Sequence, residues 1–201
     1  MIFAIHLIFL VLLSWMLSQI SRKLPLRVHF FPFLMLKFCA GIAFGLVHYY
    51  FYAHYAHGDT FVMFKQSLEG ETGSFWKSFF DYDFGKDGSQ RANFLIIMLE
   101  KINKITLQNY WITNAYFSLL SFTGFWFLAN KIVEIFPSTK YPTLIGFLYL
   151  PTTLFWTSGI SKECIMMQTI NTLVFVCLQL NFLWHKTKQW QILIACLFFI
   201  A

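Results

Sequence analysis

Long apolar stretches limit what this chain can fold into more than any other feature does. The first of them, residues 2–20, contains no charged side chain, and a helix of about 20 apolar residues crosses the ~30 Å hydrocarbon core of a bilayer. Aromatic residues make up 21% of the chain and charged residues 12%, which is about half the charged share of a soluble domain. A soluble fold of 201 residues could not bury so many large side chains. The sequence therefore predicts an all-α polytopic transmembrane helix bundle.

Five stretches are predicted to be full spans: residues 2–20, 31–55, 110–130, 141–156 and 163–184. A further apolar run, residues 190–201, would reach only about 18 Å as a helix. The run is either a re-entrant stub or the truncated start of a sixth span, and we favour the second interpretation. The prediction is thus a single transmembrane domain over residues 1–201, incomplete at its C-terminus and part of a longer protein.

Basic residues predict the orientation of the spans. With alternating spans, three short basic loops fall on one side, and their Lys and Arg residues are Arg22, Lys23, Arg27, Lys131, Lys140, Lys186 and Lys188. Cytoplasmic loops are enriched in such residues, so we expect the N-terminus and the long loop 56–109 to lie outside. The net charge of +6 suits a lipid bilayer with anionic headgroups. The charges form no basic arm, and no nucleic-acid partner is expected.

The outer loop, residues 56–109, lacks proline and repeats aromatic residues. This pattern is typical of elements that lie in the membrane interface. Asp59 is placed to cap a short helix over residues 59–69, and an amphipathic helix is predicted over residues 91–105.

Polar residues within the spans have structural interpretations. Lys37 lies within two turns of the predicted cytoplasmic edge, so its side chain is expected to reach that edge. Gly41 and Gly45 have the spacing that allows close helix packing. Asn109, Asn114 and Asn130 are expected to form hydrogen bonds between helices.

The first stretch that could carry chemistry lies where the second span leaves the membrane, and it contains Asp59. A carboxylate at this depth is costly unless it has a partner or a function. One alternative is the helix cap described above. Another is a divalent metal held by His54, His57 and Asp59, although the pattern offers no fourth ligand. The four cysteines form no CxxC pair and predict no metal site.

The second stretch covers residues 151–163. Pro151 is expected to bend or break the fourth span, and either Ser158 or Ser161 would cap the fifth. Lys162 and the positive N-terminus of that helix could bind an anion such as phosphate. The alternative is a capped turn with a surface pair between Lys162 and Glu163.

The predicted topology places Asp59 and Lys162 on the same, outer side. A carboxylate together with a cation suits a hydroxyl acceptor and a phosphorylated, lipid-borne donor. The carboxylate would act as general base and the cation would stabilise the leaving phosphate.

These two stretches also carry a resemblance to a known class of protein. The first pattern joins residues 37–41 (KFCAG), Gly45, the pair Tyr49–Tyr50 and residues 58–60 (GDT). The second is the P…W.SG..KE pattern of residues 151–163. Together they resemble multi-spanning bacterial envelope proteins, which are similar in layout to C-type (GT-C) membrane glycosyltransferases and surface-polysaccharide polymerases.

The resemblance implies a function and a set of site residues. It implies sugar transfer from a polyprenyl-phosphate donor at the outer face of the bacterial inner membrane, in cell-surface glycan assembly. Asp59 matches the catalytic acid of that family, and the expected substrate contacts are His57, Arg91, Lys162 and Glu163. Two other functions stay open: a transporter or flippase for a lipid-linked glycan, and a non-catalytic subunit of an envelope polysaccharide system.

Overall fold

The computed structural model describes residues 2–52, 59–69 and 90–183. The described residues form helices and turns without strands. In chain order, the elements are α1 (Ile2–Ser21), η1 (Arg27–His29), α2 (Phe30–Leu46), η2 (Val47–Phe51), α3 (Asp59–Glu69), α5 (Gln90–Ile105), α6 (Tyr110–Ile135), η4 (Pro137–Thr139), α7 (Lys140–Thr143), η5 (Leu144–Tyr149), α8 (Pro151–Trp156) and α9 (Lys162–Leu183). The all-helical class predicted from the sequence is confirmed for this part of the chain.

Four described helices are long and apolar enough to cross a membrane: Phe3–Ser21, Arg27–Phe51, Tyr110–Ile135 and Lys162–Leu180. These correspond to four of the five predicted spans. Most side chains of α1 face outward although they are apolar, as expected for a helix surrounded by hydrocarbon. This composition is compatible with an integral membrane protein. The predicted truncated sixth span lies outside the described residues.

The predicted span over residues 141–156 is broken and does not form one long helix. A short α-helix, α7, leads into a π-helical stretch, η5, and the backbone becomes extended at Leu150 (φ −65°, ψ 118°). Pro151 then starts α8. Proline cannot donate a backbone hydrogen bond and disfavours a helical conformation in the residue before it, which explains the break at Leu150.

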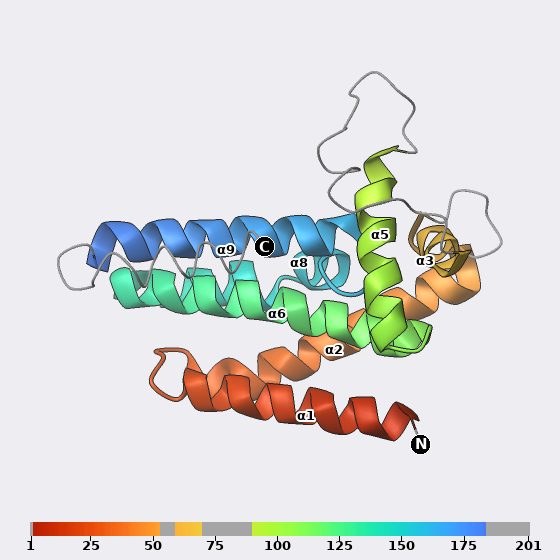
Figure 1. The fold of residues 1–201 in the computed structure, drawn as a ribbon. Coiled ribbons are helices and arrows are strands. Elements are labelled where there is room, and N and C mark those ends of the chain that lie inside the picture. Colours follow the sequence, from red (N-terminus) through yellow and green to blue (C-terminus); the bar gives the residue numbers. More distant parts are fainter. Residues whose placement is uncertain (1, 53–58, 70–89, 184–201) are drawn as a thin grey trace.

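Helix α6 is the centre of the bundle and the most buried of the four long helices. Asn109, for which a hydrogen bond between helices was expected, instead caps the start of α6: its side-chain oxygen accepts from the backbone N–H groups of Trp111 and Ile112 at 3.1 Å each. Figure 1 shows α2 and α1 on one side of α6 and α9 on the other. Helices α6 and α9 run in the same direction, so the broken segment of residues 137–156 returns the chain to the end of the bundle where α6 begins.

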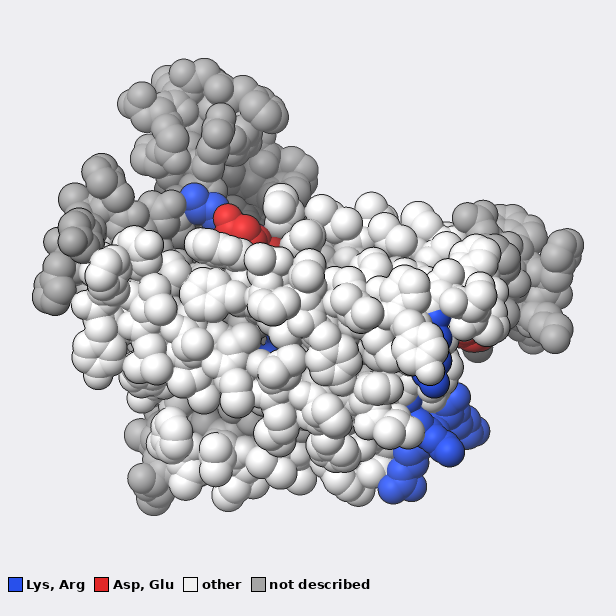
Figure 2. All heavy atoms as spheres, turned by 180° about the vertical axis from the view of Figure 1, so that it is seen from behind, with Lys and Arg blue, Asp and Glu red and all other residues white. Residues whose placement is uncertain are grey.

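The two ends of the bundle differ in charge. The α1–α2 connection and the α6–α7 connection lie at the same end (Figure 1), and they carry Arg22, Lys23, Arg27 and Lys140. Figure 2 shows Lys and Arg gathered at that end, whereas the length of the bundle between its ends is almost free of charged atoms on the face in view. We call this the basic end. The basic residues Lys186 and Lys188 lie outside the described residues.

The opposite end of the bundle holds α3, α5 and the starts of α6 and α9 (Figure 1). Helices α3 and α5 cover the ranges expected from the sequence to within one residue. Their apolar sides pack together and onto α6 and the start of α9. The buried members of this cluster, which we call the α3–α5 cluster, are Met63, Phe64, Leu95, Ile96, Leu99, Tyr110, Phe117, Ile160 and Cys164.

Candidate functional site

A tight turn between α8 and α9 is the best-defined feature of the candidate site. It covers residues 157–161 and places Gly159 at φ +83°. Residues with a side chain rarely adopt this backbone conformation. A Cβ atom at Gly159 would also run into Asn114 Oδ1 and lie 2.8 Å from the Phe44 ring. Both the conformation and the space therefore require glycine here.

Ser161 caps α9. Its hydroxyl accepts from the backbone N–H of Cys164 at 3.0 Å, which satisfies one of the free donors of the first turn. Ser158, the other residue considered as a cap, donates to the Leu154 carbonyl. Lys162 and Glu163 are then the first two residues of α9, and both are exposed. The positive end of the helix dipole and the Lys162 side chain are thus at the same place.

A hydrogen bond from Lys37 connects this turn to α2. Its side chain is only 1% exposed, and its Nζ donates to Thr157 Oγ1 at 2.5 Å. Nζ also lies 4.8 Å from the centre of the Phe125 ring on α6. The expectation that Lys37 reaches the cytoplasmic edge is wrong, because the side chain extends across the interior towards the α8–α9 turn.

The side chain of Asn114, on α6, forms hydrogen bonds to both the same turn and α2. Its Nδ2 donates to the Gly41 carbonyl at 2.7 Å, and its Oδ1 accepts from the Ile160 N–H at 3.2 Å. The expected hydrogen bond between helices is confirmed, and it extends to a third element. The close packing predicted for the two glycines of α2 is also found: a Cβ at Gly41 would clash with Ser118, and one at Gly45 would lie 3.0 Å from Trp111.

A second buried network holds α3 and α5 in place. Asn103 of α5 donates to Ser67 of α3 at 2.7 Å and accepts from Thr113 of α6 at 3.0 Å. The hydroxyl oxygens of Thr113 and Thr106 are 2.7 Å apart. All four residues are buried. The hydrogen bonds therefore attach the two helices of the predicted outer loop to the central helix.

Four of the five predicted site residues belong to α3, α5 and the start of α9, at the end of the bundle opposite the basic end (Figure 1). Asp59 is the first residue of α3 and Arg91 the second of α5, but the side chains of both lie outside the described part, and so does the whole of His57. Lys162 and Glu163 begin α9. The α3–α5 cluster brings the helix of Asp59 and the turn before Lys162 into one packed unit. The proximity of the Asp59 and Lys162 side chains stays a prediction.

Metal binding is not indicated by the described residues, which contain no group of three or more His, Cys, Asp or Glu able to hold an ion. His54 and His57, the two histidines of the proposed metal set, lie outside that part.

The interpretation of the sequence missed the role of Lys37 and Thr157. The signal was present, because an ionisable residue within an apolar helix marks a functional or specially paired position by default. The partner, however, lies 120 positions further along the chain, and no local pattern indicates it.

Searches for similar proteins place no constraint on these assignments. No family model, curated protein or solved structure matches the chain.

Proposed function

We propose that this chain is the membrane-embedded part of a glycosyltransferase that uses a polyprenyl-phosphate sugar as donor. The proposed reaction takes place at the end of the bundle that holds α3 and the start of α9. The observation that supports it best is the α3–α5 cluster, which packs the helix beginning at Asp59 against the turn that precedes Lys162. A carboxylate and a cation on elements packed in this way match the needs of the reaction.

Each residue has a definite part in the proposed chemistry. The acceptor hydroxyl attacks the anomeric carbon of the sugar while Asp59 takes its proton. The bond between that carbon and the phosphate oxygen breaks, and polyprenyl phosphate leaves with the bonding electrons. Lys162 and the first-turn N–H groups of α9 stabilise the negative charge that develops on the phosphate. His57, Arg91 and Glu163 are proposed to contact the substrates.

The buried hydrogen bonds support this proposal by holding the turn in place. Lys37 and Asn114 attach residues 157 and 160 to two different helices. A group that stabilises charge in a transition state is effective only when it does not have to reorganise during the reaction. The turn that presents Lys162 is held by such fixed contacts.

We further propose the orientation expected from the sequence, with the basic end cytoplasmic and this site at the outer face of a bacterial inner membrane. The support is the gathering of Lys and Arg at the opposite end of the bundle (Figure 2), since cytoplasmic loops are rich in these residues.

A transporter for a lipid-linked glycan is the second candidate. It is favoured by buried polar side chains on helices α2, α6 and α9, among them Lys37, Ser121, Gln168 and Asn171. Polar groups within spans commonly mark transport paths. Against it, Lys37 and Gln168 already bond to other parts of the bundle.

The test uses membranes containing the full-length protein and radiolabelled polyprenyl-phosphate sugars. We expect label to reach an acceptor with the wild type and with Glu134→Gln, a matched change at the basic end, and not with Asp59→Asn. Equal transfer by Asp59→Asn at equal expression would remove Asp59 as the base. Movement of a labelled lipid-linked glycan across the membrane without bond formation would replace the glycosyltransferase by the transporter.

A further inference from the structure

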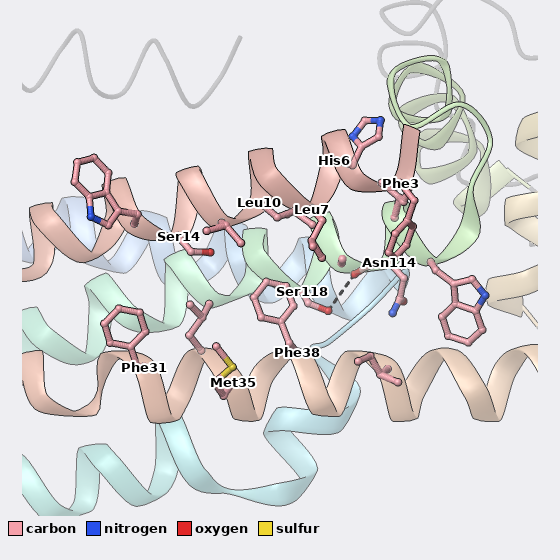
Figure 3. Close-up of a pocket in the computed structure, with 17 residues that line it drawn as sticks. Phe3, His6, Leu7, Leu10, Ser14, Phe31, Met35, Phe38, Asn114 and Ser118 are labelled. Carbon is pink, nitrogen blue, oxygen red and sulfur yellow. Dashed lines mark hydrogen bonds between the residues drawn. The ribbon is translucent and has the colours of Figure 1, made fainter. Parts of the chain in front are cut away.

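A groove runs between α1 and α2, with the beginning of α6 as its floor. Its volume is about 700 Å³, within the range of sites that hold small organic molecules. Phe31 lines it at one end and Phe3 at the other (Figure 3). Trp15, late in α1, and Ile42, late in α2, also line it. Most of the side chains between them are apolar, including Met35. A groove of this composition between two apolar helices of spanning length favours hydrocarbon as its occupant.

Three of the polar side chains in the groove, those of Ser118, Asn114 and His6, are already engaged within the protein. Ser118 donates to the Asn114 carbonyl at 3.0 Å, as Figure 3 shows, and the Asn114 amide is bonded to α2 and to the α8–α9 turn. His6 Nδ1 lies 3.0 Å from the Tyr116 hydroxyl. These partners reduce the polarity that the groove presents to an occupant.

The length of the groove matches one lipid chain. Phe31 and Ile42 both line it, and at 1.5 Å per residue they are about 17 Å apart along α2. One leaflet of a bilayer contributes about 15 Å to the hydrocarbon core. A single acyl chain lying along the groove would fill it from the side of the basic end towards the middle of the bundle and beyond.

The end of the groove at Trp15 and Phe31 faces the basic end. Arg22, Lys23 and Arg27 are exposed there, and residues 22–29 contain no acid. Arg27 precedes Phe31 by about one helical turn, or about 6 Å. The headgroup layer of one leaflet is about 5–7 Å thick. A lipid whose chain lies in the groove would therefore bring its phosphate to the level of these three cations.

We propose that this groove and the three cations together form a binding site for one anionic phospholipid. The groove takes an acyl chain, and Arg22, Lys23 and Arg27 take the headgroup. Anionic headgroups gain about 1 kcal/mol from each Lys or Arg near the surface, which is about fivefold in affinity for each cation. The site rests on α1 and α2 being helices of a membrane protein, but it does not depend on glycosyltransferase activity.

The experiment titrates the purified full-length protein in detergent with dioleoylphosphatidylglycerol or dioleoylphosphatidylcholine and follows binding by native mass spectrometry. We expect the wild type to prefer the anionic lipid. The triple variant Arg22→Gln/Lys23→Gln/Arg27→Gln should lose affinity for it by a factor on the order of a hundred. The charge-matched control is Lys65→Gln/Lys101→Gln/Lys104→Gln, whose cations belong to α3 and α5 at the opposite end. It should keep the preference.

Further variants test the groove itself. Ala115→Phe fills the groove, and Ala4→Phe adds the same bulk to an exposed position of α1 that does not line it. We expect loss of binding with Ala115→Phe and normal binding with Ala4→Phe, each at an unchanged thermal midpoint. Glycerol 3-phosphate serves as an independent probe on the wild type, which keeps the proposal testable where Ala115→Phe disturbs folding. It should not compete with the anionic phospholipid for binding. Equal affinity for both lipids, equal effects of the two charge variants, or full competition by glycerol 3-phosphate would each overturn the proposal.

Discussion

Replacing Thr157 by valine removes the one hydrogen-bond acceptor that the described residues give to the buried Nζ of Lys37. Valine has nearly the shape of threonine, so the packing should change little. A buried donor left without a partner costs about 1–3 kcal/mol. For a protein of this size, a loss of about 2 kcal/mol lowers the midpoint of thermal unfolding by about 4–8 °C.

Lys37→Met provides the second side of a double-mutant cycle. It removes the buried donor and keeps the length of the side chain. Exchanging a buried polar pair for apolar groups of similar volume is often neutral or stabilising. We therefore expect Lys37→Met to unfold at or above the wild-type temperature. The double variant should resemble Lys37→Met, because valine at position 157 then leaves no donor unpaired.

Thr169→Val is the matched control for this cycle. Thr169, like Thr157, donates to the carbonyl four positions earlier, but it is exposed, and no lysine of the described residues bonds to it. Thermal unfolding in detergent, followed by circular dichroism, measures all four variants. The coupling inferred from the structure would be refuted if Thr157→Val and Thr169→Val lowered the thermal midpoint equally. It would also be refuted if the midpoint changes of Lys37→Met and Thr157→Val simply added in the double variant.

Two further predictions concern the turn and the outer helices. Gly159→Ala should lower the thermal midpoint by several degrees, since alanine in the left-handed region costs about 1–2 kcal/mol and its Cβ meets Asn114. The control Gly146→Ala, at a position with open space around it, should leave the midpoint unchanged. Equal midpoints for the two variants would contradict this account of the turn. Asn103→Leu should accelerate amide hydrogen exchange in α3, because it removes the bonds to Ser67 and Thr113, whereas exchange in α6 should change little. Unchanged exchange in α3 would show that apolar packing alone holds it.

Local features of the fold were predictable because their causes are local. Apolar runs of spanning length predicted the four long helices of the described residues, and Pro151 predicted a bend or a break, which is found at Leu150. The spacing of Gly41 and Gly45 predicted the close approach of α2 and α6. Each of these follows from residues within a few turns of one another.

The contacts that hold the candidate site were not predictable, because they join distant positions. Lys37 and Thr157 are separated by 120 positions, and Asn114 reaches both Gly41 and Ile160. The side chain of Lys37 is long enough to reach the nearest membrane edge, so the sequence alone favoured that direction. Only the packing of the helices around it shows that the side chain extends into the interior instead. Asp59 and Lys162 could be assigned to one end because alternating spans determine the side on which each segment emerges.

For the membrane-embedded protein that we propose, the break at Leu150 has a consequence for how the chain enters the bilayer during synthesis. The segment that returns from the basic end is divided into short helical pieces, and its backbone is extended where they meet. Hydrocarbon tolerates such backbone only where neighbouring protein surrounds it. A nascent chain would therefore complete the insertion of this segment only after α2 and α6 are in place to receive it, and release of α9 from the ribosome would precede the final docking of the turn.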